Sequence, residues 1–137
     1  GPKVDFDDND DRVKEITGGA KVPVVFDSVG KDTFSGSLDC LKPRGLWVSY
    51  GSASGPVKAF DIGMLSAKGS LYATRPTLMT YTATREGLLA NAGRLIDLVA
   101  KGIVKIEVNQ TYPLSAAAEA HRDLEARQTT GSTVFIP

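Results

Sequence analysis

Short, continuous apolar runs alternate with stretches of helical spacing along most of this chain. The runs lie at residues 22–29, 46–50 and 70–74, and each has the length and composition of a buried strand. Strands that alternate with helices form βαβ units, whose strands are parallel. The sequence therefore predicts the α/β class with a mostly parallel sheet.

Helical signals lie before, between and after these runs. Asp32 is expected to cap a helix on which Phe34, Leu38 and Leu41 share one face. In chain order, the other expected elements are a short helix at residues 8–16 that ends at Gly18-Gly19, a turn at 42–45, a short helical piece at 62–65 and a long helix at 88–99 with Gly102 as its C′ residue.

The C-terminal segment has a different pattern. Residues 104–108 alternate like a half-exposed strand, Ser115 is expected to cap a short alanine-rich helix, and residues 132–136 form a last strand. These strands need not belong to the same sheet as the earlier ones.

Composition narrows the classes of function. The 137 residues carry 16 basic and 16 acidic side chains without a basic stripe, which argues against a surface that coats duplex nucleic acid. The single cysteine, Cys40, forms no internal disulfide and makes a thiolate zinc site implausible. Apolar runs shorter than a membrane span and the lack of a secretory signal lead us to expect a cytoplasmic protein.

Small and polar residues follow each of the three apolar runs. They are Ser28-Val29-Gly30, the loop Gly51-Ser52-Ala53-Ser54-Gly55, and Ala73-Thr74-Arg75. Parallel strands present their carboxyl ends at one edge of the sheet, where α/β proteins bind ligands, so these segments predict one wall of a nucleotide-sized crevice. Arg75 has a fork of donors that suits phosphate or carboxylate. Small residues also end strands without any ligand, and neither glycine-rich phosphate-binding fingerprint is present.

Other candidate chemistries have weaker support. Ala53 stands where the nucleophile elbow G-x-S-x-G needs its serine, which argues against a hydrolase. His121, the only histidine, is expected to be packed or hydrogen-bonded rather than catalytic, and Cys40 to be a small core residue. The N-terminal aspartates lack the spacing of a calcium loop, so no metal site is predicted.

An ordered set of motifs covers nearly all of the chain and carries a family resemblance. It includes Val13-Lys14-Glu15-Ile16-Thr17-Gly18-Gly19, Asp27-Ser28-Val29-Gly30, Tyr50-Gly51-Ser52-Ala53-Ser54-Gly55, Lys68-Gly69-Ser70-Leu71-Tyr72, Thr74-Arg75-Pro76 and Ala120-His121-Arg122-Asp123-Leu124-Glu125-Ala126-Arg127. With these motifs the chain resembles the zinc-independent NADPH:quinone oxidoreductases, the zeta-crystallin-like branch of the medium-chain dehydrogenase/reductase superfamily. The resemblance implies metal-free hydride transfer from NADPH to quinones or α,β-unsaturated carbonyls.

The resemblance also implies which residues contact the cofactor. It assigns no catalytic side chain and no metal ligand. The implied NADPH contacts are Ser28, Val29, Tyr50, Gly51, Ser52, Ala53, Ala73, Thr74, Arg75 and Arg127, with Phe6 at the adenine end.

Members of this family are about twice as long, so the resemblance implies that the chain is their C-terminal part. Residues 1–103 would be a partial nucleotide-binding (Rossmann) domain, an incomplete doubly wound sheet without its glycine-rich loop. Residues 104–137 would return to the catalytic domain, so their strands would lose their native partners. The chain alone is expected to bind NADPH weakly or not at all and to reduce no quinone. A homodimer is expected through the strand at residues 70–74.

Two other interpretations stay open at this stage. The first is a non-enzymatic module, RNA-binding or structural like a crystallin, although neutral charge and few aromatic residues argue against RNA. The second is a different doubly wound enzyme, such as a methyltransferase-like fold, because Phe26-Asp27-Ser28-Val29-Gly30 alone fits many folds.

Overall fold

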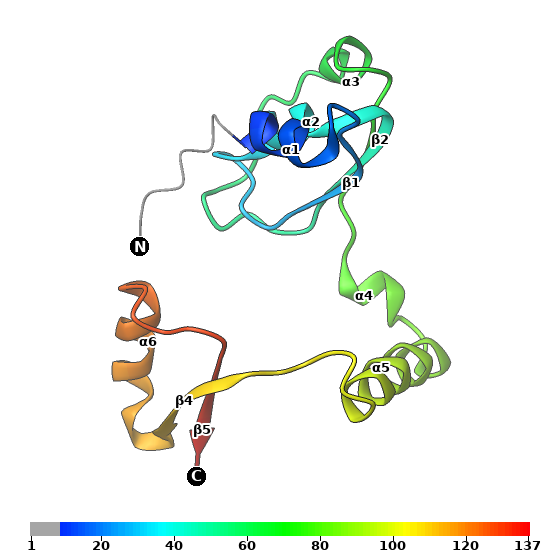
Figure 1. Ribbon diagram of the computed structural model, residues 1–137. Helices are drawn as coiled ribbons and strands as arrows, with labels where there is room; N and C mark the ends of the chain where they lie inside the picture. The colour runs from blue at the N-terminus through cyan, green and yellow to red at the C-terminus, as the bar shows by residue number, and fades with distance from the viewer. Residues whose placement is uncertain (1–8) are drawn as a thin grey trace. The chain divides into compact units, whose positions relative to one another are not determined.

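The computed structural model describes residues 9–137, so a prediction that concerns Phe6 lies outside the described residues. The chain divides into two compact units, one that ends at Tyr81 and one that spans Thr82–Pro137. We describe each unit by itself (Figure 1). The domain division at residues 103/104, which the family resemblance implies, stays a prediction.

The first unit contains a parallel three-stranded sheet. Its strands are β1 (Val22–Asp27), β2 (Leu41–Ser49) and β3 (Tyr72–Thr74), in the spatial order β1-β2-β3. Each strand overlaps one of the three apolar runs. The predicted α/β class and parallel sheet are therefore confirmed.

Among residues 9–81, four helices accompany this sheet: α1 (Asn9–Thr17), α2 (Phe34–Asp39), α3 (Gly63–Ala67) and α4 (Leu78–Tyr81). Helix α1 ends as predicted at its glycines, where Gly19 N–H donates to Lys14 and Gly18 N–H to Glu15 in a Schellman motif. The predicted N-cap of α2 is wrong by one residue, because the N-cap is Thr33, whose side chain makes no capping hydrogen bond. The backbone N–H of Asp32 donates to Ser54 Oγ at 3.0 Å.

The core of the first unit lies between α2 and the sheet. Its buried residues are Leu38, Leu41, Trp47 and Leu71. Phe34 and Phe60 pack on the Trp47 indole, with ring centroids 6.4 Å and 5.7 Å away. Phe34 and Phe60 also contact each other, with ring centroids 6.4 Å apart, so the single tryptophan of the chain belongs to a cluster of three aromatic rings.

The predicted turn at residues 42–45 is a bulge inside β2. Val22 pairs with Leu41 but Val24 pairs with Leu46, so β2 carries three extra residues at this point. Arg44 has a left-handed φ of 61°, and its N–H donates to the Gly69 carbonyl at 2.8 Å. The expected strand start at residue 46 was wrong because this long-range bond keeps the bulge in the sheet.

The second unit begins with α5 (Arg85–Ala100), the longest helix. Thr84 caps it, since its side chain accepts from Gly87 N–H at 3.0 Å. Gly102 is the C′ residue as predicted: it has φ of 68°, and its N–H donates to Val99 while Ile103 N–H donates to Leu98.

The rest of the second unit is one strand–helix–strand motif. Strands β4 (Val108–Pro113) and β5 (Ser132–Ile136) pair in parallel and are joined through η2 (Leu114–Ala116) and α6 (Ala117–Glu125). The strand expected at 104–108 starts only at its last residue, because the register of β5 matches 108–113. Instead of capping α6, Ser115 lies inside η2, and the N-cap Ala116 has no capping side chain.

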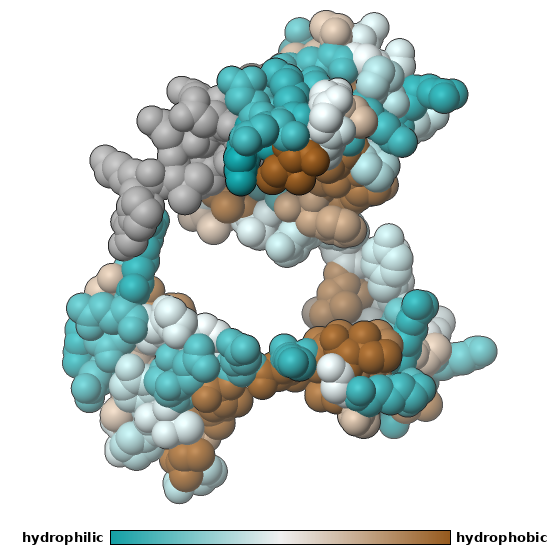
Figure 2. Space-filling model, in the orientation of Figure 1, coloured by the Kyte–Doolittle hydropathy of each residue, from teal (hydrophilic) through white to brown (hydrophobic). Residues whose placement is uncertain are grey.

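Apolar side chains reach the surface of the second unit (Figure 2), at the C-terminus and over α5. Among its described residues only Ala120 is a buried hydrophobic residue. Tyr112 Oη donates to Asp123 at 2.6 Å and so ties α6 to β4. Nowhere in residues 9–137 is a helix long and apolar enough to cross a membrane.

Candidate functional site: the carboxyl edge of the parallel sheet

The three parallel strands of the first unit end at the same edge of their sheet. Residues 28–30 follow β1, residues 50–55 follow β2, and Arg75 follows β3. This is the edge at which open α/β sheets bind ligands. The topology of the sheet therefore brings the three segments of the predicted crevice wall to one edge.

The first two of these segments are bonded directly to each other. The N–H groups of Ala53 and Ser54 donate to the carbonyls of Ser28 (3.2 Å) and Val29 (2.9 Å). Ser54 Oγ also donates to the Val29 carbonyl at 2.8 Å. Residues 28–30 and 51–55 thus form one bonded pair of loops, which we call the loop pair.

Two glycines allow the loops to approach so closely. A Cβ on Gly51 would overlap the carbonyl of Ser28. Gly30 has φ of 89°, and a Cβ there would lie 2.8 Å from the Gly55 carbonyl oxygen. Any larger side chain at position 51 or 30 would push the two loops apart.

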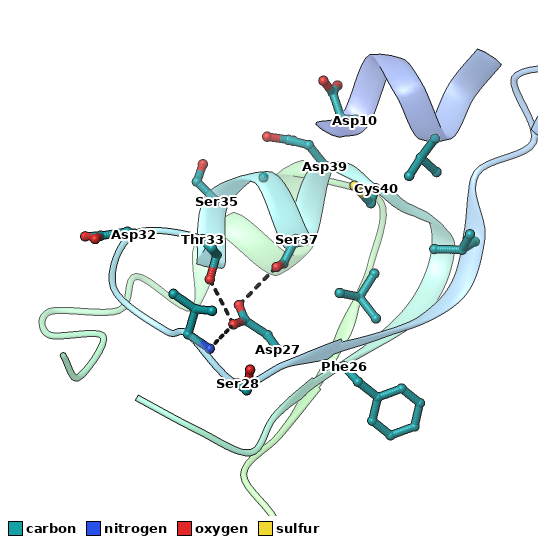
Figure 3. Close-up of a pocket in the computed structure, with 15 residues that line it drawn as sticks. Asp10, Phe26, Asp27, Ser28, Asp32, Thr33, Ser35, Ser37, Asp39 and Cys40 are labelled. Atoms are coloured by element: carbon teal, nitrogen blue, oxygen red, sulfur yellow. Dashed lines mark hydrogen bonds between the residues drawn. The ribbon is translucent and has the colours of Figure 1, made fainter. Parts of the chain in front are cut away.

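Asp27, the last residue of β1, stabilises the loop pair through hydrogen bonds to its side chain. The residue is 4% exposed, and its carboxylate accepts hydrogen bonds from Thr33, Ser37 and the Val29 amide (Figure 3), and from Gly30 N–H as well. Burial alone would raise the pKa of Asp27, but these hydrogen bonds outweigh it and hold the pKa below its usual value. Asp27 is therefore a carboxylate at neutral pH.

Arg75 stabilises the loop after β2 through its guanidinium group. Its Nη1 donates to the carbonyls of Ser49 and Gly51, at 2.9 Å each, and its Nη2 lies 3.4 Å from Ser52 Oγ. The sequence suggested a fork for an anion. In the structure, half of that fork is committed to the backbone, so Arg75 shapes the loop as well as lining the site.

A cavity of about 460 Å³ opens beside Arg75. Aromatic and apolar side chains form much of its lining, and hydroxyl groups and the guanidinium supply the polar part. Its lining residues are Trp47, Ser49, Ser52, Pro56, Val57, Phe60, Ala73, Thr74 and Arg75. A second cavity of about 450 Å³ lies over α2 and β1, where Ser28, Val29 and Asp27 contribute to its lining.

The structure brings most of the predicted contact residues to this edge. Ser52, Ala73, Thr74 and Arg75 line the first cavity. Five further predicted contact residues lie in or beside the loop pair but do not line this cavity: Ser28, Val29, Tyr50, Gly51 and Ala53. Arg127 lies in the second unit with a left-handed φ of 58°, and Phe6 is outside the described residues.

Sequence reasoning missed Asp27 and the aromatic lining of the cavity. The signal for Asp27 was local: an aspartate at the end of an apolar run, followed within a few residues by N–H and hydroxyl donors, is typical of an Asx-type turn. Trp47 and Phe60 carried no such signal, because an aromatic residue in a strand or a loop is most often simply core.

Two residues singled out by chemistry do not line the cavity beside Arg75, although one of them, Cys40, lines the second cavity. Cys40 is buried, as predicted, and burial raises the pKa of its thiol. His121 is exposed rather than packed, because α6 turns Ala120 toward its neighbours and the next residue away from them. Across residues 9–137 no three His, Cys, Asp or Glu side chains come together as a metal site.

Comparisons with known proteins agree with this geometry. A quinone oxidoreductase of Pseudomonas aeruginosa is 58% identical over 126 residues, which are 92% of this chain and 39% of that protein. A 2-haloacrylate reductase of a Burkholderia species is 45% identical over 128 residues, 91% of this chain and 38% of that protein. The chain therefore spans about two fifths of the length of these relatives.

A solved structure gives the same result in three dimensions. The quinone oxidoreductase of Escherichia coli, complexed with NADPH, superposes with a TM-score of 0.86 at 53% identity over 93% of this chain and 40% of that one. The parallel sheet matches the Rossmann-like part of such enzymes, which confirms both the predicted fold class and the resemblance. A family model described as zinc-binding dehydrogenase matches residues 3–135. The chain belongs to this dehydrogenase family.

Proposed function

We propose that this chain supplies the nicotinamide side of an NADPH-binding crevice in a quinone oxidoreductase. The observation that carries the proposal is the convergence of three parallel strand ends on one cavity, lined by Ser52, Ala73, Thr74 and Arg75. The E. coli relative is a quinone oxidoreductase solved with NADPH, which supports the same assignment. Arg127 and Phe6 join the proposed contacts by family resemblance alone.

The cavity has the chemistry that a nicotinamide ring requires. Trp47, Phe60 and Val57 offer apolar surface against which a planar ring can pack. Ser52, Thr74 and the guanidinium of Arg75 offer hydrogen-bonding groups for the amide and ribose that such a ring carries. The residues present therefore fit the group.

When bound, NADPH supplies the hydride, and the protein has to hold two reactants in register. The loop pair and Arg75 do this by fixing the wall of the crevice, while the apolar lining excludes water from it. The proposed acceptors are quinones or α,β-unsaturated carbonyls; the similarity to a 2-haloacrylate reductase supports the second class.

Trp47 provides a direct test of cofactor binding. It is the only tryptophan and lines the cavity, so a bound reduced nicotinamide should quench its fluorescence by energy transfer. We expect saturable quenching by NADPH with a roughly millimolar Kd, since the chain supplies only part of the contacts. Quenching that stays linear, as collisions produce, would contradict the proposal.

A chimera tests catalysis. Residues 3–135 replace the matching segment of the E. coli enzyme, and NADPH oxidation by a quinone is followed at 340 nm, a general absorbance of reduced nicotinamide. We expect activity within about tenfold of the parent, a loss of about 1.4 kcal/mol in transition-state stabilisation. A folded chimera that binds NADPH but reduces no quinone would limit the proposal to cofactor binding.

We also propose a homodimer through the edge of β3. Among the described residues β3 has only β2 as a neighbour, and Tyr72 on it is 62% exposed. Light scattering should give twice the mass of one chain, and the Tyr72→Lys variant should have the mass of a single chain. A monomer at high concentration in the unmodified chain would contradict the dimer.

A cytoplasmic location without a nucleic-acid partner belongs to the same proposal.

A further inference from the structure

Asp27 has a feature that neither cofactor contact nor core packing explains. Its two carboxylate oxygens serve different parts of the first unit. Oδ1 accepts from Val29 N–H (2.9 Å), Gly30 N–H (3.0 Å) and Thr33 Oγ1 (2.8 Å), whereas Oδ2 accepts from Ser37 Oγ (3.0 Å) and Trp47 Nε1 (3.3 Å). One oxygen thus holds the loop after β1, and the other holds α2 and the indole that lines the cavity.

The loop that Oδ1 holds is the support of the next loop. Ser28 and Val29 present their carbonyls to Ala53 and Ser54, and Gly51 lies against Ser28 without room for a Cβ. Asp27 itself contacts this second loop through its backbone carbonyl, which accepts from Tyr50 N–H at 2.9 Å and from Gly51 N–H at 3.3 Å. Within the described residues its carboxylate makes no hydrogen bond to residues 51–55, so any effect of the carboxylate there passes through residues 28–30.

We propose that Asp27 is a positioning residue of the cofactor crevice: its carboxylate fixes residues 28–30, and these in turn fix residues 51–55. This inference rests on the proposed function for its cofactor and on the geometry alone for its relay. Hydrogen bonds to a charged acceptor are about twice as strong as neutral ones. A neutral side chain at position 27 therefore loosens both loops, although it touches only the first.

Asp27→Asn removes the charge and keeps the shape. The amide oxygen can still accept from Val29, Gly30 and Thr33, and the Ser37 hydroxyl can rotate to accept from the new NH₂ group. The indole N–H of Trp47 then faces a donor. The variant is thus expected to fold, with weakened bonds to the loop. Asp27→Ala removes both oxygens and should give a larger effect in the same direction.

Backbone hydrogen exchange measured by NMR on this chain tests the relay. In Asp27→Asn we expect protection to fall by about tenfold at the amides of Val29 and Gly30, and also at those of Ala53 and Ser54. The amides of the β1–β2 ladder should keep theirs. Ser37→Ala is the matched control, because it removes one bond to Oδ2 and leaves Oδ1 untouched.

Leu71→Ala provides the control for stability. Leu71 is 6% exposed and belongs to the core, so its loss should lower protection at all amides together. If Asp27→Asn gives this uniform pattern, the residue only stabilises the fold and the proposal is wrong. If Val29 and Gly30 lose protection while Ala53 and Ser54 keep theirs, the relay does not exist.

Titration with NADPH, read by Trp47 fluorescence, separates this inference from the proposed function. We expect the Kd to rise about tenfold in Asp27→Asn and to change little in Ser37→Ala, each measured against its own starting signal. An equal Kd in Asp27→Asn and the unmodified chain would overturn the positioning role. Loss of protection at both loops without NADPH binding to any variant would leave the relay standing and reject the proposed cofactor.

Discussion

The two units of this chain keep their shape by different means. The first unit has a buried cluster around Leu38 and Trp47 and a loop pair joined by backbone hydrogen bonds. The second has a parallel pair of strands tied to α6 through Tyr112 and Asp123, with most of its apolar side chains exposed. A two-stranded sheet alone is marginally stable. The rigid part of the chain is therefore the part that carries the proposed site.

The largest expected effect comes from the core of the first unit. Leu38→Ala removes a fully buried side chain and should lower the free energy of unfolding by about 2–5 kcal/mol. Urea denaturation followed by Trp47 fluorescence measures it. Leu124→Ala on α6 is the counterpart in the second unit, and because this leucine is 58% exposed the change should stay within about 0.5 kcal/mol. Equal effects would erase the contrast.

A pair of glycines sharpens the contrast at the level of the backbone. Gly51→Ala forces a Cβ into the Ser28 carbonyl and should destabilise the first unit by about 1–3 kcal/mol. Gly93→Ala meets no atom within 4 Å on α5 and should favour its helix by about 0.5–1 kcal/mol. Thermal denaturation followed by circular dichroism gives both values. An unchanged Tm for Gly51→Ala would show that the two loops can accommodate a Cβ at this position.

The pH dependence of stability should separate Asp27 from surface carboxylates. Its pKa is lowered in the folded state, so the stability it adds is present above the unfolded pKa of about 3.9 and is lost as pH falls through the folded pKa. The urea midpoint of the first unit should fall from about pH 5 downward, and less steeply in Asp27→Asn.

Asp10→Asn is the control for that measurement. A hydrogen bond from Lys14 at 2.8 Å lowers the pKa of Asp10, but on the surface of α1 rather than beneath the loop pair. We expect a smaller change in the acid slope from this variant. The interpretation of Asp27 fails if the two variants alter the slope equally.

The smallest expected effect lies in the second unit. Tyr112→Phe removes the bond to Asp123 and should loosen the contact between α6 and β4 without unfolding either. Hydrogen exchange at the β4 amides should increase modestly, while that of the first unit stays unchanged. A response in the first unit would show that the units do not behave independently.

Local patterns predicted much of this fold correctly. The three apolar runs became β1, β2 and β3 because a buried parallel strand needs only a short continuous stretch of apolar residues. The glycine that ends α5 was also readable, since a left-handed C′ position favours glycine. In both cases the deciding interactions lie within a few residues of the chain.

The incorrect predictions of strand bounds lie where residues far apart in the sequence determine the structure. The bulge at residues 42–45 depends on the bond from Arg44 to Gly69, and the start of β4 depends on its register with β5. The edge of the site was predicted, because parallel strand ends must meet there. Its anchor, Asp27, was not, because its importance comes from donors on the β1–α2 loop, α2 and β2 together.

Chemical-shift mapping with NADPH is the sharpest test of the proposed cofactor site at the carboxyl edge of the sheet. The amide resonances of this chain are followed while the cofactor is added. We expect the largest shifts at residues 28–30, 50–55 and 73–75, at the carboxyl edge of the sheet. Shifts centred instead on the opposite edge, at residues 42–45 and Gly69, would contradict it.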